Sequence, residues 1–207
     1  MTKFYYAKGT CALAAHLVLE EAGAHYEAHC VDFAASEQRS AAYLAINPLG
    51  RVPALITDQG VLTETPAILV WIAQTHPERN LALMNDPFRF ARVQSFNSYL
   101  ASTVHVAHAH KTRGARWTDD PAAQAALTRQ VPQTMTRAFE LIEQAMPDGP
   151  WVMGEDFTVS DAYLFTLARW LEGDSVDIAT FPKVQAHFER MKARPVTSRV
   201  LSLHIKT

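Results

Sequence analysis

The 207-residue chain is long enough for one large or two small domains, and its 48% hydrophobic and 19% charged residues are ordinary for a globular protein. The net charge of −2 gives no attraction to nucleic acid or to an anionic membrane surface. No apolar stretch matches a signal peptide or a membrane span, and the two cysteines fit neither a disulfide framework nor a metal site, so we expect a cytoplasmic protein.

The first eighty residues change their hydrophobic period repeatedly. Residues 3–6 and 25–33 have the pattern of strands, and the helical pattern of residues 11–23 ends at a glycine. A short helix is expected before Asn47. A strand at 54–56, a turn, a return strand at 61–63 and a helix opened by Pro66 complete the segment. We therefore expect a small α/β domain over residues 1–79.

After Pro77 the strand patterns stop. Residues 80–87 are typical of a linker, and helical periodicity then predicts helices at about 88–112, 121–146, 160–172 and 182–193. The second domain, residues 88–207, is expected to be entirely helical.

Cys11 lies where the first strand gives way to a helix, directly after Gly9 and Thr10. The backbone N–H groups and dipole of a helix N-terminus favour a thiolate and lower the pKa of a cysteine. The alternative is a small residue that merely begins a helix. Cys30 lies in an apolar alternation and is expected to be an inert core thiol.

Glu64 and Thr65 immediately precede the proline that opens the next helix. Thr65 is either a simple helix cap or part of an anion site, because a helix N-terminus also binds carboxylates. Glu64 beside it is suited to an ammonium group. Upstream, Pro53 begins a strand; with a cis bond before it, the backbone of Val52 could pair with an extended peptide.

Three histidines lie close together at positions 105, 108 and 110. On a helix His105 and His108 share a face, whereas His110 points away and is expected to be a solvated position. Residues 87–118 contain five lysines or arginines and no carboxylate, which disfavours a metal site. We expect no metal, and interpret this face as the wall of a binding groove.

Thr158 and Asp161 form a capping-box pattern before an apolar run, so we expect a structural role for both.

Four segments in this order resemble a cytosolic glutathione transferase, most closely of the bacterial beta class: "YAKGTC" (6–11), "NPLGRVPAL" (47–55), "LTETPAI" (62–68) and "GEDFTVSDAYLF" (154–165). The resemblance implies a thioredoxin-like α/β N-terminal domain joined to an all-α C-terminal domain, in a homodimer. It implies a detoxification enzyme that conjugates glutathione, its cosubstrate, to electrophilic, largely apolar small molecules.

The resemblance also assigns roles to residues. Val52 would pair its backbone with the cysteinyl part of glutathione, ahead of a cis-proline at Pro53, and Glu64 and Thr65 would hold the γ-glutamyl head. Cys11 would lie beside the glutathione sulfur, and His105 would point at it. The second-substrate pocket is expected to include His108, Trp117 and Trp170.

The chain departs from the family pattern at several positions. Lys8 replaces a proline, Ser98 replaces an asparagine that contacts glutathione across the dimer interface, and the family's lysine for the glycine carboxylate has no match. Arg39 or Arg51 is the expected substitute. The thiol-activating group is Thr10, Cys11 or His105.

Two other functions remain open on the residues alone. Cys11 could cycle through a mixed disulfide with glutathione, as a monothiol disulfide reductase or peroxidase, because Ala14 stands where a second cysteine of a redox motif would be. A ligand carrier without catalysis is the third hypothesis, which retention of Cys11, Glu64 and Thr65 argues against.

Overall fold

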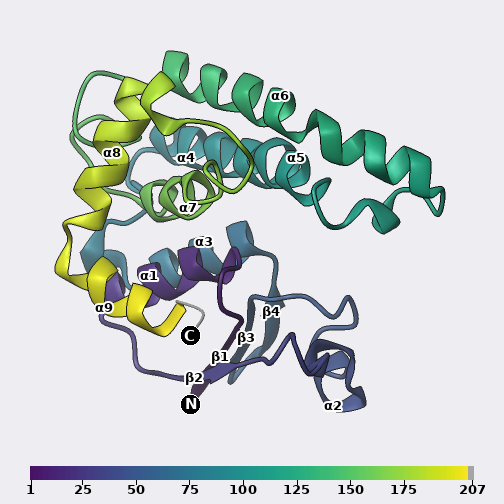
Figure 1. Ribbon diagram of the computed structural model, residues 1–207. Helices are drawn as coiled ribbons and strands as arrows, with labels where there is room; N and C mark the ends of the chain where they lie inside the picture. The colour runs from purple at the N-terminus through teal and green to yellow at the C-terminus, as the bar shows by residue number, and fades with distance from the viewer. Residues whose placement is uncertain (205–207) are drawn as a thin grey trace.

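The computed structural model describes residues 1–204 and has two layers of helices above a small sheet (Figure 1). The sheet contains β1 (Thr2–Tyr6), β2 (Tyr26–Cys30), β3 (Ala54–Thr57) and β4 (Gly60–Thr63), in the order β2-β1-β3-β4. β1 and β2 are parallel. β1 pairs antiparallel with β3, with Phe4 opposite Leu55, and β3 pairs antiparallel with β4, with Leu55 opposite Leu62. The expected strand–helix–strand–helix–hairpin–helix order is thus confirmed.

The helix α1 (Ala12–Ala22) lies between the sheet and the helical half of the molecule (Figure 1). Its residues Ala12–Leu19 are all buried, because this helix is apolar on every face and packs against α3, α7 and α9 as well as the sheet. Gly23, with φ of 70°, ends it in the left-handed conformation expected of a C-terminal cap. The short α2 (Ala41–Leu44) and α3 (Thr65–Thr75) complete this part of the chain.

The rest of the chain is helical. α4 (Pro87–Tyr99) continues through a π-helical turn, η3 (Leu100–Val104), into α5 (His105–Ala109), which together form one long helix. His105 and His108 lie in α5, and His110 is its C-cap residue. α6 (Pro121–Ala145), α7 (Val159–Ala168) and α8 (Pro182–Lys192) follow. Single 3-10 turns occur at Glu37–Arg39, Pro77–Arg79, Gly114–Arg116 and Ile178–Thr180, labelled η1, η2, η4 and η5. No helix of the described residues is long and apolar enough to cross a membrane.

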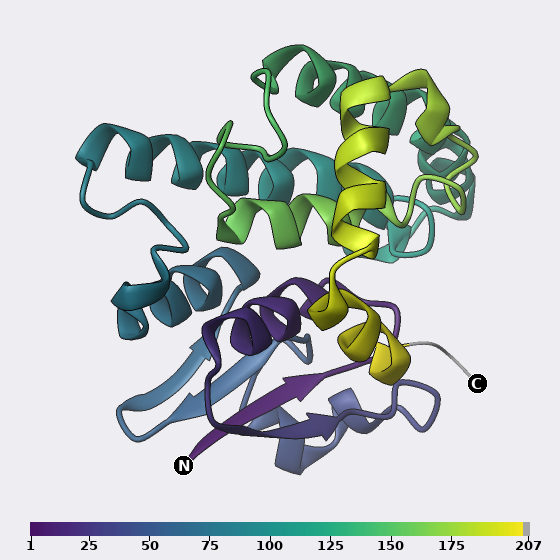
Figure 2. The ribbon, with the colours of Figure 1, turned by 90° about the vertical axis from the view of Figure 1, so that its left-hand side faces the viewer.

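One further helix, α9 (Pro195–His204), was not expected from the sequence. It leaves the helical layer and packs against α1, as the turned view of Figure 2 also shows. At its end, His204 Nε2 lies 2.9 Å from His16 Nδ1 in the core of the first half. The last described helix therefore completes the burial of the α/β part.

The prediction of a buried Cys30 is wrong. β2 is the edge strand of the sheet, and Cys30 at its end is exposed. The alternating apolar pattern of residues 25–33 marks a strand correctly, but it does not show whether any element covers its outer face.

Candidate active site between the two halves of the chain

Cys11 lies at the N-terminus of α1, as expected, but its thiol is turned into the protein. The residue is 7% exposed, and its Sγ donates to the backbone oxygen of Val52 at 3.5 Å. Val52 belongs to the loop before β3, so the contact joins the two segments expected to hold a sulfur and an extended backbone. The peptide bond between Val52 and Pro53 is cis.

The expected lowering of the Cys11 pKa is wrong. Burial raises the pKa of the Cys11 thiol to about 11, and the Thr65 hydroxyl and the Arg116 charge offset this only in part. The backbone N–H of Cys11 also lowers the pKa, but Leu13 N and Ala14 N at the start of the helix already donate to Thr10 O and Cys11 O. Desolvation of the anion is the larger effect.

Thr10 is not placed as a thiol donor. Its hydroxyl donates to Ala7 O at 2.7 Å and accepts a long bond from Ala12 N at 3.4 Å. Both contacts close the turn between β1 and α1. The Thr10 hydrogen is therefore engaged locally, and its expected part in activating a thiol has no support from this geometry.

The loop before β3 is fixed by two side chains. Tyr43 Oη and Asn47 Nδ2 both donate to Arg51 O, at 2.7 and 2.8 Å. The Arg51 side chain is exposed. Arg39 reaches the same loop: one of its terminal nitrogens lies 3.6 Å from the position that a Cβ on Gly50 would occupy. The two arginines proposed from the sequence are thus neighbours.

Glu64 and Thr65 begin α3. Glu64 has φ of 69° and ψ of 122°, a backbone conformation that costs free energy for a residue with a side chain. Within residues 1–204 no side chain caps this helix, so its first-turn N–H groups, which Pro66 lacks, are available to an external acceptor. Glu64 is exposed and Thr65 is buried, so a free carboxylate stands beside an uncapped helix N-terminus.

His105 enters the site from the helical half. Its ring packs against Trp170, with centroids 5.1 Å apart. Burial lowers the pKa of His105 to about 4, and three cations add to this effect when charged: His108, Arg116 and Arg51. Of these cations, Arg51 belongs to the loop that carries Val52. At neutral pH the imidazole is therefore uncharged.

Two cations that the sequence analysis did not assign, Arg113 and Arg116, lie around η4. Burial lowers the pKa of Arg116, and three neighbouring arginines act in the same direction: Arg51, Arg113 and Arg39. Among residues 1–204, none of these four arginines forms an ion pair with a carboxylate. Only their convergence in space reveals them, because positions 39, 51, 113 and 116 come from both halves of the chain.

His108 has a structural partner that the sequence analysis did not find. Its Nδ1 lies 2.6 Å from Oδ2 of Asp174, a residue 2% exposed, and its ring stacks on Trp170 at 4.1 Å. Lys111 Nζ is 3.4 Å from the other oxygen of Asp174. The pair holds α5 and the segment after α7 together. In the part of the chain that the structure describes, no group of three potential metal ligands occurs.

The remaining predicted residues lie elsewhere. Trp117 is 47% exposed, and its ring packs edge-on against His110 at 4.5 Å, with no ring contact to Trp170. His110 is half-buried and lines an open groove, so its position is partly solvated. Ser98 is exposed on α4, whereas its neighbour Asn97 is buried and accepts from Ser160 Oγ at 2.9 Å.

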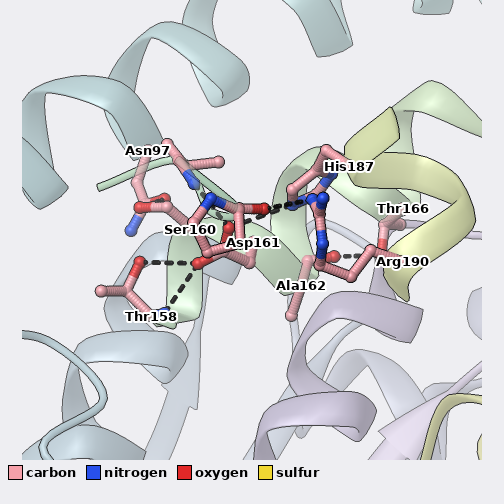
Figure 3. Close-up of polar contacts among 10 residues, drawn as sticks. Asn97, Thr158, Ser160, Asp161, Ala162, Thr166, His187 and Arg190 are labelled. Atoms are coloured by element: carbon pink, nitrogen blue, oxygen red, sulfur yellow. Dashed lines mark hydrogen bonds and ion pairs between the residues drawn. The ribbon is translucent and has the colours of Figure 1, made fainter. Parts of the chain in front are cut away.

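The capping box predicted at Thr158 and Asp161 is confirmed (Figure 3). Asp161 accepts from Thr158 N at 2.7 Å, from Val152 N at 2.8 Å, and contacts His187 Nε2 at 3.0 Å. Asp161 and His187 are 0% and 1% exposed, so the carboxylate joins α7 to α8 inside the protein. It has no access to a substrate.

Comparison with known proteins places this geometry in context. Residues 1–74 match the model of the glutathione S-transferase N-terminal domain, and residues 101–195 match that of the C-terminal domain. The glutathione S-transferase GstA of Escherichia coli O157:H7 is 32% identical over 203 residues, covering 97% of both chains.

Solved structures of glutathione transferases are also similar to this chain. A glutathione transferase homologue from Sulfitobacter, with bound glutathione, is 42% identical with a TM-score of 0.95, covering 100% of this chain and 99% of that one. A bacterial beta class glutathione S-transferase from Sphingomonas chungbukensis is 30% identical with a TM-score of 0.84, covering 98% of each chain.

Proposed function

We propose that this chain, which belongs to the glutathione S-transferase family and is a glutathione transferase, binds glutathione across the junction formed by Glu64, Val52, Cys11 and His105. The observation that carries the assignment is the start of α3. An uncapped helix N-terminus suits the α-carboxylate of the γ-glutamyl group, and the adjacent free Glu64 carboxylate suits its ammonium group.

The strained backbone at Glu64 supports this role. A residue with a side chain at φ of 69° is retained where the conformation serves a site, and this one turns the carboxylate out beside the helix start. From there an extended peptide reaches the backbone of Val52, which precedes β3 just as Glu64 follows β4, the strand that pairs with β3. Its far carboxylate comes to the neighbouring Arg39 and Arg51, which have no carboxylate of their own in residues 1–204.

The glutathione sulfur then lies beside Cys11 and below His105. Conjugation needs the thiolate, which attacks an electrophilic carbon, forms a C–S bond and expels the leaving group. The Cys11 thiol, with its pKa at about 11, stays protonated with its S–H directed to Val52 O, so it places no negative charge beside the glutathione sulfur. The neutral His105 imidazole is free to donate an N–H to the sulfur, and Arg116 adds a positive charge nearby.

Disulfide reductase or peroxidase chemistry through Cys11 is the less favoured alternative. Such chemistry begins with attack by the cysteine thiolate, and its rate follows thiolate fraction and access. Cys11 is 7% exposed and has a raised pKa, so it is poor in both.

A homodimer is part of the proposal. Phe88, at 73% exposed, and Leu141, at 55%, leave apolar surface on α4 and α6. An open groove of about 350 Å³ runs between these helices and α5, lined by Tyr99, Val106 and His110 among others. A second copy is the expected cover, because such exposed apolar surface marks interaction sites. Light scattering at micromolar concentration tests this; a monomer counts against it.

The enzyme assignment is tested by two reactions run side by side with glutathione: conjugation of a chloronitrobenzene and reduction of a small disulfide. We expect turnover of the first and little of the second. Dominant disulfide reduction that is lost in Cys11→Ala would favour the redox alternative, and no turnover in either would favour a carrier.

A further inference from the structure

A second, smaller cavity lies at the start of α1, next to residues of the proposed site. Its volume is about 80 Å³, and it is lined by Gly9, Thr10, Leu13, Thr166, Arg169, Trp170 and His204. Two of its walls also border the site already described. Thr10 directly precedes Cys11, and Trp170 packs against His105. A molecule that reacts at the glutathione sulfur therefore has this cavity within reach.

The cavity contains a cation without a counter-ion. Arg169 follows α7, and its guanidinium has no hydrogen bond or ion pair with any residue in the described range 1–204. It extends over the Phe165 ring, 6.0 Å from the centroid. Arg169 is an exposed residue, and burial of part of its side chain lowers the pKa of the guanidinium. A guanidinium held against apolar and aromatic neighbours gains more from an anion than one in bulk water.

A second polar group in the cavity wall also lacks a partner. His204 is 3% exposed; its Nε2 contacts His16 Nδ1, while its Nδ1 is buried with no hydrogen-bond partner among the described residues. Where His16 Nδ1 donates to His204 Nε2, the free Nδ1 of the neutral ring carries the hydrogen and becomes a donor. That N–H is covered by protein, so the charge offered to an anion in the cavity comes from Arg169.

The size of the cavity selects the kind of anion. An engineered cavity of about 150 Å³ binds benzene, and a water molecule takes about 30 Å³ in the liquid. A volume of about 80 Å³ is therefore too small for the ring of an aromatic acceptor but sufficient for a carboxylate. The ring itself would rest outside, along Trp170 and near His105.

We propose that this cavity binds the carboxylate of the second substrate, so that the enzyme favours electrophiles that carry a carboxylate a short distance from the reacting carbon. The inference rests on the proposed function, since it takes the sulfur position from it. It changes the expectation of largely apolar acceptors. The unpaired arginines around η4 act in the same direction, because their field attracts anionic molecules to the junction.

The test compares two acceptors that differ only in charge: a chlorodinitrobenzoate with its carboxylate para to the chlorine, and the uncharged amide of the same acid. In both, the glutathione thiolate forms a C–S bond at the chlorinated carbon and chloride leaves. Each kcat/KM is divided by the uncatalysed rate with glutathione. We expect the native enzyme to favour the carboxylate by about tenfold or more, as for a charge-assisted hydrogen bond.

Arg169→Gln should remove this preference by raising KM for the carboxylate, with turnover of the amide changed less than about twofold. Arg169→Lys should keep part of it. Arg129→Gln, which removes an exposed arginine on α6, should keep all of it. Glutathione affinity, measured by calorimetry, and the unfolding midpoint show that each variant is folded and binds its cosubstrate.

Three results would overturn the proposal. The first is equal normalised kcat/KM for the two acceptors in the native enzyme, and the second is an equal loss for both in Arg169→Gln. The third is found in a chain that lacks residues 205–207. If Arg169→Gln no longer changes the preference in that shortened chain, the arginine acts through the chain end and not on the carboxylate. Failure of both acceptors to react, with glutathione bound, would instead refute the proposed function.

Discussion

His16 Nδ1 and His204 Nε2 lie 2.9 Å apart in the core, joining the first helix to the last described one. Both residues are almost fully buried, at 1% and 3% exposed. One ring donates and the other accepts, which requires that the accepting ring be neutral. Burial is the main cause that lowers the pKa of His16 to about 4 and that of His204 to about 3.

This pair predicts loss of stability in acid. Because the folded pKa values lie below the ordinary value, the unfolded chain takes up the protons first, and stability falls as pH drops from 6.5 towards 4. Each imidazole should contribute about 2 kcal/mol to the difference in unfolding free energy between about pH 7.5 and pH 5. Urea unfolding at both pH values measures it.

The double variant His16→Leu, His204→Phe should show a smaller pH difference than the native protein, whereas His25→Gln, at an exposed position, should not. Two neighbouring charges also act on this pair: Glu20 on α1 raises the pKa of His16, and Arg169 lowers the pKa of His204. Both residues are therefore left unchanged in every variant that is compared. An identical pH dependence in the double variant would show that the loss arises elsewhere.

Glu64→Ala should weaken glutathione binding by about 1.5–3 kcal/mol, as expected for the loss of a charge-assisted hydrogen bond. The physical reason is the free carboxylate at the uncapped start of α3. Calorimetry measures the affinity, and Glu78→Ala, which removes an exposed carboxylate from η2, is the matched control. Unchanged affinity in Glu64→Ala would remove the γ-glutamyl assignment.

Cys11 should react slowly with a thiol reagent and Cys30 quickly. With a pKa of about 11, Cys11 is a thiolate in roughly one molecule in ten thousand at neutral pH, and it is buried, whereas Cys30 is exposed. Mass spectrometry after brief labelling of the native protein should find Cys30 modified at least about ten times faster. In Cys30→Ser only Cys11 can react, so its slow labelling is measured alone. Denaturation should abolish the difference in labelling rate between the two cysteines. Rapid labelling of Cys11 would contradict the effect of burial.

His105→Ala should lower conjugation about tenfold, the low end for a positioned proton donor or acceptor. Because the pKa of His105 is lowered to about 4, the ring stays neutral from about pH 5.5 upwards, and the rate should show no inflection near 6.5. His105→Gln, which keeps an N–H donor, should retain more activity than His105→Ala. If a chelator abolishes activity and zinc restores it, the histidines are metal ligands and this account is wrong.

Asp161→Ala should destabilise the protein by about 3–5 kcal/mol, because it leaves buried donors of Val152, Thr158 and His187 without their acceptor. Asp177→Ala removes an exposed cap at η5 and should cost only about 1 kcal/mol. Urea unfolding compares the two. Equal losses would mean that the network drawn in Figure 3 contributes no more than a surface cap.

The features that the sequence determined are local ones. The period of residues 12–22, the glycine at position 23 and the spacing of Thr158 and Asp161 each act within a few residues of the chain, so their structures follow from the pattern. The motifs around Cys11, Pro53 and Glu64 identify the family in the same way, because each lies within a short segment.

Tertiary structure decided how those residues behave chemically. A helix N-terminus predicts a thiolate at Cys11, but the Val52 loop and neighbouring segments bury the sulfur and reverse the direction of the pKa change. Asp174 pairs with His108 across 66 residues, and His16 with His204 across 188. The cost of removing water from a charged group depends on every segment packed around it, and no local pattern contains that information.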